Sequence, residues 1–204
     1  MLVCINGNIG AGKSTLMTLL EKQGHKVVLE GIDRSTWGTL LDDYYRDPHR
    51  YAFLFQMVVL MDLKEVFDSI KDDPTPLIFI ERSVVDCLAF AMLIHKETKM
   101  TDTEFATFKQ VYETLECLPH LIITLDLPCE TCVDRIRHRG RECELGITLE
   151  YLRGVEEMTT LAHETCPDVP QRSIKVADRT PQSIVEEVLS VCCFHKSEKI
   201  NLTL

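Results

Sequence analysis

Five short apolar runs divide the chain, at residues 2–5, 26–30, 77–80, 121–127 and 173–176. Each has the length and the apolar content of a strand that is buried on both faces of a sheet. Between these runs, apolar residues recur every three or four positions, which predicts amphipathic helices. Strands that alternate with helices form parallel sheets, so the pattern predicts an α/β fold with about five parallel strands and helices on both faces.

Capping residues set the bounds of several predicted helices. The Asp47-Pro48 pair begins a long helix that reaches about residue 71, and a capping box at residues 101–104 begins one that reaches about residue 117. A final helix starts near Pro181, and the tail at 194–204 shows no period and is expected to be disordered. No linker or repeat divides the sequence, so residues 1–204 are expected to form a single domain.

A glycine-rich loop follows the first apolar run. Residues 7–15 read GNIGAGKST and fit the P-loop pattern GxxxxGKS between a predicted strand and a predicted helix. The glycines let successive backbone N–H groups point at one oxyanion, and the helix that follows adds its positive end. In this pattern Lys13 reaches the β- and γ-phosphates, and the Ser14 hydroxyl ligates Mg²⁺. The sequence therefore predicts a nucleotide-phosphate site formed by Gly7, Asn8, Ile9, Gly10, Ala11, Gly12, Lys13, Ser14 and Thr15.

One carboxylate ends the second apolar run. Ligands of open α/β sheets bind at the carboxyl ends of the strands, which makes Glu30 a candidate catalytic residue. A solvated charge at a strand end is an equally good interpretation of its position.

The most basic stretch of the chain is at residues 135–141 and contains four arginines at alternate positions. A solvated surface is the usual explanation of such a run. Here it continues into a short polar segment, and the two together predict a mobile lid at about residues 137–147. Since a phosphate site already exists upstream, and guanidinium groups bind phosphate oxygens bidentately, we interpret the arginines as a phosphate clamp: Arg135, Arg137, Arg139 and Arg141.

Composition excludes several classes of protein. With 22 Lys and Arg against 32 Asp and Glu, the net charge of -10 disfavours a nucleic-acid partner. No apolar run is long enough to span a bilayer, and we expect no membrane association and no presequence. Nine cysteines, an odd number, favour reduced thiols and a cytoplasmic location, with the nucleus also compatible. The Cys129-x-x-Cys132 pair lacks a partner pair at zinc spacing, so we interpret it as ordinary helix-start residues.

A P-loop alone does not define a reaction. The guanine-recognition tetrapeptide of GTPases is absent from the sequence, and 204 residues leave no room for the extra domains of motor or transporter ATPases. What remains is a small phosphotransferase.

Four motifs in order resemble one family, the cellular and viral deoxynucleoside kinases, which include deoxycytidine, deoxyguanosine and non-zinc thymidine kinases. The resemblance extends from the P-loop to about Leu152 and implies a three-layer P-loop kinase fold. The motifs are the P-loop, the segment YYRDP at 44–48 followed by Phe55-Gln56, the triplet Glu81-Arg82-Ser83, and the lid RxxxRxRxxE from Arg135 to Glu144.

The resemblance implies a role for each of these residues in transfer of phosphate from ATP to a deoxynucleoside 5′-hydroxyl during nucleotide salvage. Glu30 would be the general base, Arg82 would hold the hydroxyl, and Ser14 and Glu81 would place Mg²⁺. Gln56 would read the base, beside Phe55, and Tyr45 and Glu144 would hold the sugar. The resemblance also implies a homodimer, and phosphoryl clamping by Arg135, Arg139 and Arg141.

One segment departs from the family pattern. Gly31 stands where the family has a proline after the glutamate, and Trp37 lies seven residues past Glu30 rather than five. The loop is therefore longer, which leaves Asp33 as a rival to Glu30 for the base role.

Two alternatives remain open. A nucleoside monophosphate kinase of the thymidylate kinase type would need basic residues for the acceptor phosphate, for which Arg34 and Arg50 are the candidates. A non-catalytic nucleotide-binding protein would not need the intact lid and base-reading residues.

The base pocket predicts a preference for pyrimidines. Relatives that accept purines place an arginine and an aspartate at the positions of Leu63 and Cys87, which are uncharged here. An alignment shifted by one residue would instead bring Asp62 or Asp86 to the pocket. We expect an apolar pocket around Val59, Leu63, Cys87 and Ala91, with Gln56 as its main polar residue.

Overall fold

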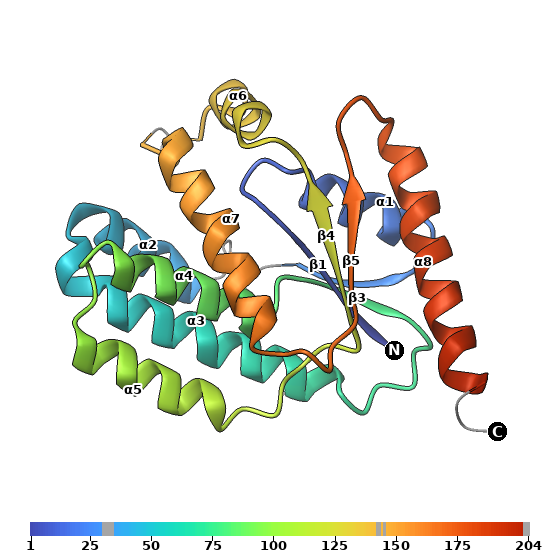
Figure 1. Ribbon diagram of the computed structural model, residues 1–204, viewed down its shortest axis with the longest axis horizontal. Helices are drawn as coiled ribbons and strands as arrows, with labels where there is room; N and C mark the ends of the chain where they lie inside the picture. Colours follow the sequence, from blue (N-terminus) through green and yellow to red (C-terminus); the bar gives the residue numbers. More distant parts are fainter. Residues whose placement is uncertain (30–34, 142–143, 145, 202–204) are drawn as a thin grey trace.

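Five parallel strands form the centre of the molecule in a computed structural model (Figure 1). The structure describes residues 1–29, 35–141, 144 and 146–201, and the side chains of residues 35–37 and 197–201 lie outside the description. The strand order is β2-β3-β1-β4-β5, so the strand that leads into the P-loop is central. The predicted parallel α/β sheet is confirmed, with strands β1 (Leu2–Gly7), β2 (Lys26–Val28), β3 (Ile78–Glu81), β4 (Leu121–Asp126) and β5 (Gln171–Lys175).

Helices cover both faces of this sheet, as Figure 1 shows. Their starts follow the capping residues: the Asp47 side chain accepts a hydrogen bond from the backbone N–H of Arg50, and Thr101 and Glu104 form the predicted capping box. The helices are α1 (Lys13–Lys22), α2 (Ser35–Arg46), α3 (Pro48–Ile70), α4 (Val84–Lys96), α5 (Asp102–Glu113), α6 (Cys129–Arg139), α7 (Leu149–Glu164) and α8 (Pro181–Asn201).

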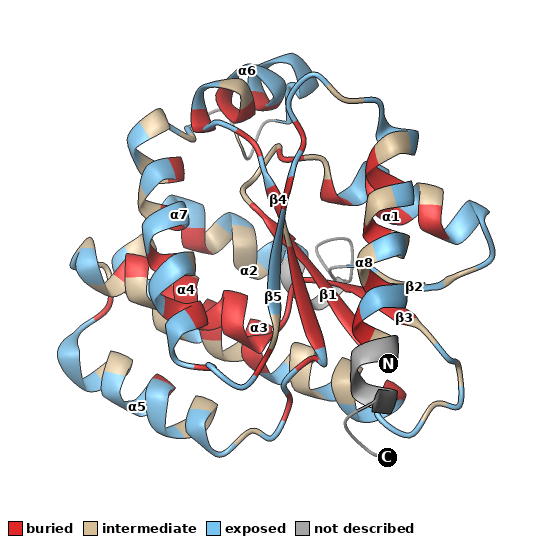
Figure 2. Cartoon of the chain, turned by 45° about the vertical axis from the view of Figure 1, so that its right-hand side comes forward, coloured by how far each residue is buried: buried red, intermediate tan, exposed pale blue. Residues whose placement is uncertain are grey.

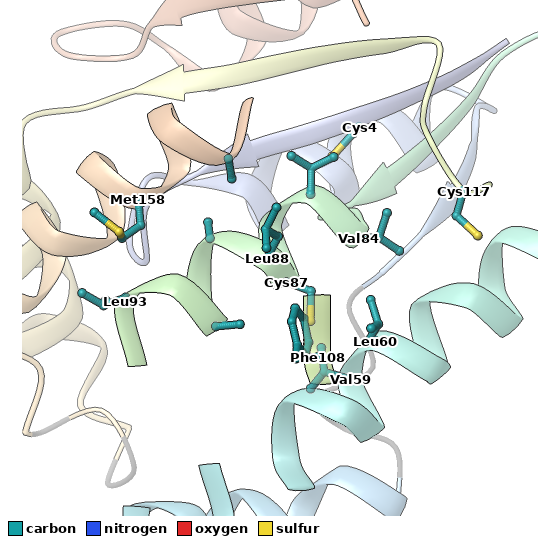
Figure 3. Packing of buried hydrophobic residues seen from close by; sticks show 14 of the residues in the cluster. Cys4, Val59, Leu60, Val84, Cys87, Leu88, Leu93, Phe108, Cys117 and Met158 are labelled. Atoms are coloured by element: carbon teal, nitrogen blue, oxygen red, sulfur yellow. The ribbon is translucent and has the colours of Figure 1, made fainter. Parts of the chain in front are cut away.

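Alternate side chains of the central strand enter two separate cores. Leu2 and Cys4 pack against α3, α4 and α5, and Figure 3 shows this core around Cys87 and Phe108. Val3 and Ile5 pack on the other face, where α1, α6 and α8 lie. The centre of the sheet is buried and the outer faces of the helices are exposed (Figure 2). Because both faces are buried, the strand reads as a continuous apolar run rather than an alternating one.

Several element bounds differ from the predictions. The second strand ends at Val28 rather than at residue 30, and α5 ends at Glu113 rather than near residue 117. α2 was not predicted, although Leu40, Leu41 and Tyr44 pack inward from it. α8 continues to Asn201 through most of the segment whose sequence shows no period, and His195 on it is buried.

The structure also shows the state of the cysteine thiols and the length and composition of the helices. Eight cysteines lie among the described residues, and all are free thiols. Burial raises the pKa of Cys129 and of Cys132 to about 11, which favours the protonated thiols and fits their interpretation as ordinary helix-start residues. Within the described chain, no helix combines the length and the apolar composition needed to cross a membrane.

Candidate active site

A cavity of about 500 Å³ opens at the carboxyl ends of the parallel strands. It brings together segments that are far apart in the sequence, as expected for an open α/β sheet. The lining comprises the P-loop, the inner faces of α2, α3 and α4, the lid and the start of α8, with Ile9, Lys13, Ser14, Tyr45, Phe55, Gln56, Val59, Leu63, Glu81, Arg82, Cys87, Arg135, Arg139, Arg141, Glu144 and Tyr151 among its residues.

Backbone geometry explains the glycines of the P-loop. Gly7, Gly10 and Gly12 have φ angles of 143°, 85° and 104°, in the region that L side chains rarely adopt. A Cβ at Gly10 would also lie 2.8 Å from the backbone oxygen of Cys132 at the start of α6. The loop is therefore closely packed against α6 as well as tightly curled.

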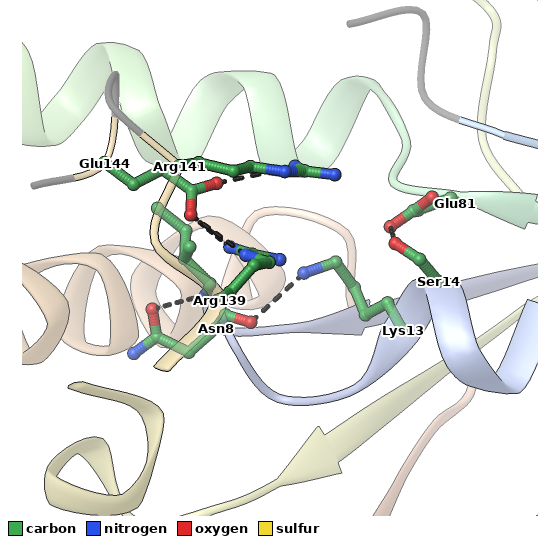
Figure 4. A network of polar contacts seen from close by, with 8 residues as sticks. Asn8, Lys13, Ser14, Glu81, Arg139, Arg141 and Glu144 are labelled. Carbon is green, nitrogen blue, oxygen red and sulfur yellow. Dashed lines mark hydrogen bonds and ion pairs between the residues drawn. The ribbon is translucent and has the colours of Figure 1, made fainter. Parts of the chain in front are cut away.

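Lys13 and Asn8 hold this curl from inside. The Lys13 ammonium is buried and donates a hydrogen bond to the carbonyl oxygen of Gly7 at 2.8 Å. It also donates to the carbonyl oxygen of Asn8 at 3.1 Å (Figure 4). The Asn8 amide donates to Leu152 O at 2.8 Å, and its Oδ1 accepts from the backbone N–H of Ile9. Gly7 and Asn8, both predicted to bind the nucleotide, thus shape the loop and do not line the cavity, whereas Ile9 to Thr15 line it.

Ser14 and Glu81 come together although 67 residues separate them. The Ser14 hydroxyl donates to Glu81 Oε1 at 3.1 Å, and Glu81 is buried at the end of β3 (Figure 4). Hydroxyl and carboxylate oxygens are the ligands that Mg²⁺ prefers, so this pair fits the predicted metal site.

Arg82 lines the cavity directly after the end of β3. Its φ is 66°, a strained value for a residue with a side chain, and its guanidinium lies 4.6 Å from the centre of the Phe90 ring. The backbone turn after β3 therefore places a buried cation in the wall of the cavity.

The lid arginines contact the P-loop and one another. Arg135 Nη1 lies 3.5 Å from the carbonyl oxygens of Gly10 and Ala11. Glu144 bridges the other two, accepting from Arg139 Nε at 3.0 Å and lying 3.5 Å from Arg141 (Figure 4). The three guanidinium groups thus line the same cavity as the P-loop.

Aromatic and apolar residues form the opposite end of the cavity. Tyr44 stacks on Phe55 with ring centres 5.3 Å apart, and Tyr45 beside them is exposed at the rim. Gln56 is buried there, with its Oε1 3.4 Å from the Cys87 thiol. An amide held in an apolar recess can read the edge of a base through one acceptor and two donors.

Sequence reasoning missed one wall of the cavity. Val176, Arg179, Pro181 and Ile184, from the end of β5 and the start of α8, line it beside the P-loop. The rule that ligands bind at the carboxyl ends of parallel strands could have identified this segment. On α4, the lining residues are Cys87, Phe90 and Ile94, whereas the predicted Ala91 is fully buried in the core.

Three predicted features lie outside the described residues. Glu30, its rival Asp33 and the side chain of Trp37 belong to this group, so their roles stay predictions.

Burial also affects the protonation of two tyrosines in the cavity wall. It raises the pKa of Tyr44 and Tyr151 above the ordinary value, so both hydroxyls are protonated at neutral pH and can donate hydrogen bonds. Tyr151 follows the lid at the start of α7 and was not predicted as a cavity residue.

Known proteins are similar to this chain in sequence and in fold. A family model described as deoxynucleoside kinase matches residues 3–192. The putative deoxynucleoside kinase of Frog virus 3 (isolate Goorha) is 32% identical over 159 residues, covering 78% of this chain and 80% of the relative. Deoxycytidine kinase 2 of Gallus gallus is 30% identical, covering 97% of this chain and 84% of the relative.

Solved structures agree at the level of the fold. Deoxyadenosine kinase from M. mycoides, determined with dCMP and dCDP bound, superposes with a TM-score of 0.81 at 22% identity, over 94% of this chain and 98% of that one. This likeness confirms the predicted P-loop kinase fold. Since the family model spans nearly all of the sequence, the chain belongs to the deoxynucleoside kinase family.

Proposed function

We propose that this kinase transfers the γ-phosphoryl group of ATP to the 5′-hydroxyl of a pyrimidine deoxynucleoside, thymidine or deoxycytidine, in nucleotide salvage for DNA synthesis. The observation that carries the proposal is the single cavity that joins the P-loop to the apolar recess around Gln56. Arg82 and the lid arginines line the same cavity, in which the phosphoryl group would pass.

The proposed step is an in-line displacement. The 5′-oxygen forms a bond to the γ-phosphorus while the bond to the β–γ bridging oxygen breaks, and ADP leaves with that electron pair. The hydroxyl proton passes to the carboxylate of Glu30, which follows β2 by two residues. Arg82 orients the hydroxyl, and Arg135, Arg139 and Arg141 stabilise the charge on the transferring group. Ser14 and Glu81 would hold Mg²⁺, which would supply positive charge at the phosphate oxygens when bound.

The shape of the base pocket supports the pyrimidine preference. Leu63 and Cys87 line the cavity, as expected from the unshifted alignment. Asp86 instead accepts hydrogen bonds from Ser83 N at 2.6 Å and Ser83 Oγ at 3.1 Å, and Asp62 lines a separate small recess. A purine would leave polar atoms without partners beside Leu63 and Cys87, whereas burial of the thymine methyl is worth about 1 kcal/mol. The resulting discrimination is roughly tenfold to a hundredfold in kcat/KM.

Two further parts of the proposal concern the sugar and the assembly. Tyr45 at the rim and Glu144 on the lid would hold the 3′-hydroxyl, since both line the cavity.

A homodimer would bury Leu54 and Met61, which are exposed on α3. Light scattering of the purified protein tests whether it is a dimer.

The monophosphate kinase alternative finds less support. Arg50 lies over the Tyr51 ring at 5.2 Å and is not among the residues that line the cavity, and Arg34 lies outside the described residues.

The test is an assay with ATP radiolabelled at the γ-phosphate against the four deoxynucleosides and dTMP. We expect product with thymidine and deoxycytidine and little with the purines or dTMP. Higher kcat/KM for deoxyguanosine or deoxyadenosine would overturn the pocket assignment, and phosphorylation of dTMP alone would overturn the nucleoside assignment. The double variant Leu63→Arg/Cys87→Asp should gain purine activity, with Leu161→Arg on the exposed face of α7 as the matched control.

A further inference from the structure

A buried polar contact lies directly behind the P-loop. Asn6, the residue of β1 that precedes Gly7, is 1% exposed, and His163 near the end of α7 is 8% exposed. Asn6 Nδ2 and His163 Nε2 are 2.9 Å apart, although 157 residues separate them. Neither side chain lines the cavity, so neither belongs to the site described above.

A backbone N–H group decides which atom of this contact donates and which accepts. Gly7 N donates to Asn6 Oδ1 at 2.5 Å, so the oxygen of the Asn6 amide faces the P-loop and its nitrogen faces His163. An amide nitrogen can only donate. His163 Nε2 must therefore accept, which requires a neutral imidazole with its proton on Nδ1.

The surroundings of His163 favour the neutral ring. Burial lowers the pKa of His163 below its ordinary value, and the nearby carboxylate of Asp86 at the start of α4 opposes this with a smaller effect. The Asp86 carboxylate also interacts electrostatically with Cys4 on β1, Tyr112 on α5 and Cys166 after α7. Burial raises the pKa of each of these three groups, so they are neutral. α7 and α4 pack side by side on one side of the sheet (Figure 1).

A displacement of Asn6 would be transmitted through Gly7 to Lys13. The carbonyl oxygen of Gly7 accepts from Lys13 Nζ at 2.8 Å, and Gly7 itself is tightly enclosed, since a Cβ there would lie 3.0 Å from Leu125 O. A shift of Gly7 therefore moves the group that contacts the nucleotide phosphates.

We propose that His163 is a positioning residue for the P-loop: its neutral Nε2 holds Asn6, Asn6 holds Gly7, and protonation of His163 weakens nucleotide binding. The inference rests on the proposed role of the P-loop in binding the donor phosphates. Loss of one such hydrogen bond corresponds to roughly a three- to tenfold loss of nucleotide affinity.

The experiment uses three variants of the full chain. His163→Leu removes the acceptor, His163→Gln keeps an acceptor that does not titrate, and Asn6→Asp offers a carboxylate that favours the protonated ring. The first readout is the ¹⁵N NMR signal of His163, which reports the protonation of Nε2 directly. The second is the affinity for a non-hydrolysable ATP analogue, measured between about pH 5 and pH 8, around the ordinary pKa of histidine.

We expect Nε2 to be unprotonated in the wild type at neutral pH, with affinity falling three- to tenfold as His163 gains a proton. His163→Gln should bind as the wild type does at neutral pH and should lose the acidic decline. Asn6→Asp should raise the pKa of His163. His163→Leu should bind weakly at every pH. If His163→Leu does not fold, the other two variants decide the matter.

A protonated Nε2 in the neutral wild type, or an acidic decline that persists unchanged in His163→Gln, would overturn the inference. Neither readout needs phosphoryl transfer, so a wild type that phosphorylates no deoxynucleoside but shows the expected titration would overturn only the proposed function.

Discussion

The two cationic regions of the active site are held in different ways. Lys13 is buried and hydrogen-bonded to carbonyl oxygens of its own loop, and that loop is fixed by β1 and α6. The lid side chains of Arg139 and Arg141 are 36% and 53% exposed, and both form ion pairs with Glu144 of the same lid. The fold positions the first charge before substrate arrives, whereas the second set is held by a few exposed ion pairs. Ordering such side chains costs conformational entropy, and the free energy of substrate binding must offset this cost.

The largest effect should come from removing the charge that the fold positions. Lys13→Ala should lower phosphoryl transfer from ATP by at least about 10³-fold, because a preorganised cation at the transferring phosphate is lost. Thermal melting should change little, since the hydrogen bonds of the side chain to Gly7 O and Asn8 O lie within its own loop. Lys22→Ala, at the exposed end of α1, is the matched control for both measurements. Retained activity with a normal melting curve would remove the P-loop from the mechanism.

Glu30→Gln separates proton transfer from charge positioning. We expect turnover to fall by roughly 10² to 10⁴, the usual contribution of a positioned base, with nucleoside binding largely intact. Turnover is measured under saturating ATP, and binding is measured by titration with the deoxynucleoside. Near wild-type turnover would move the base role to Asp33 or to no side chain at all.

A pair of glycine variants tests how tightly the P-loop is packed. Gly10 and Gly24 have similar φ angles, 85° and 88°, but a Cβ at Gly10 would meet Cys132 O whereas one at Gly24 would have no neighbour within 4 Å. Gly24→Ala should therefore cost only the left-handed backbone strain, about 1–2 kcal/mol, and leave activity unchanged. Gly10→Ala should lower Tm further and reduce kcat/KM by about 10²-fold through displacement of the loop. Equal effects of the two substitutions would mean that the approach to α6 does not matter.

The smallest effect should come from the lid. Glu144→Gln breaks the bridge between Arg139 and Arg141, but exposed ion pairs stabilise proteins by at most about 1 kcal/mol, so Tm should stay nearly unchanged. The KM for the deoxynucleoside should rise about three- to tenfold, because one proposed sugar contact is weakened. A large fall in Tm would show instead that the lid pairs are part of the folded core.

Most of the fold could be predicted because its signals are local. The doubly buried strands read as apolar runs, and capping residues marked the starts of α3 and α5. α2 was missed because its segment contains Gly38 and was interpreted only as a binding motif, although Leu40 and Tyr44 face the core.

The site was predictable where a motif fixes the chemistry and unpredictable where the fold alone brings residues together. The P-loop, Glu81-Arg82-Ser83 and the lid each carry a sequence pattern, and the structure places them around one cavity. The contact between Asn6 and His163 has no such pattern, since a polar residue at a strand end and a histidine on a helix are individually unremarkable in a sequence. The same holds for Arg179, which reaches the cavity only because β5 lies beside β4.

The buried thiols give the two cores separate reporters of local opening. Cys4, Cys87, Cys117 and Cys166 lie in the core that α3, α4 and α5 cover, while Cys129, Cys132 and Cys192 lie in the opposite one. A thiol reagent can modify such a residue only when its surroundings open, so each modification rate measures an opening free energy. Cys193, exposed on α8, provides the reference rate of a thiol that needs no opening. The two cores on opposite faces of the sheet can thus be followed independently during binding or unfolding, without introducing a new cysteine.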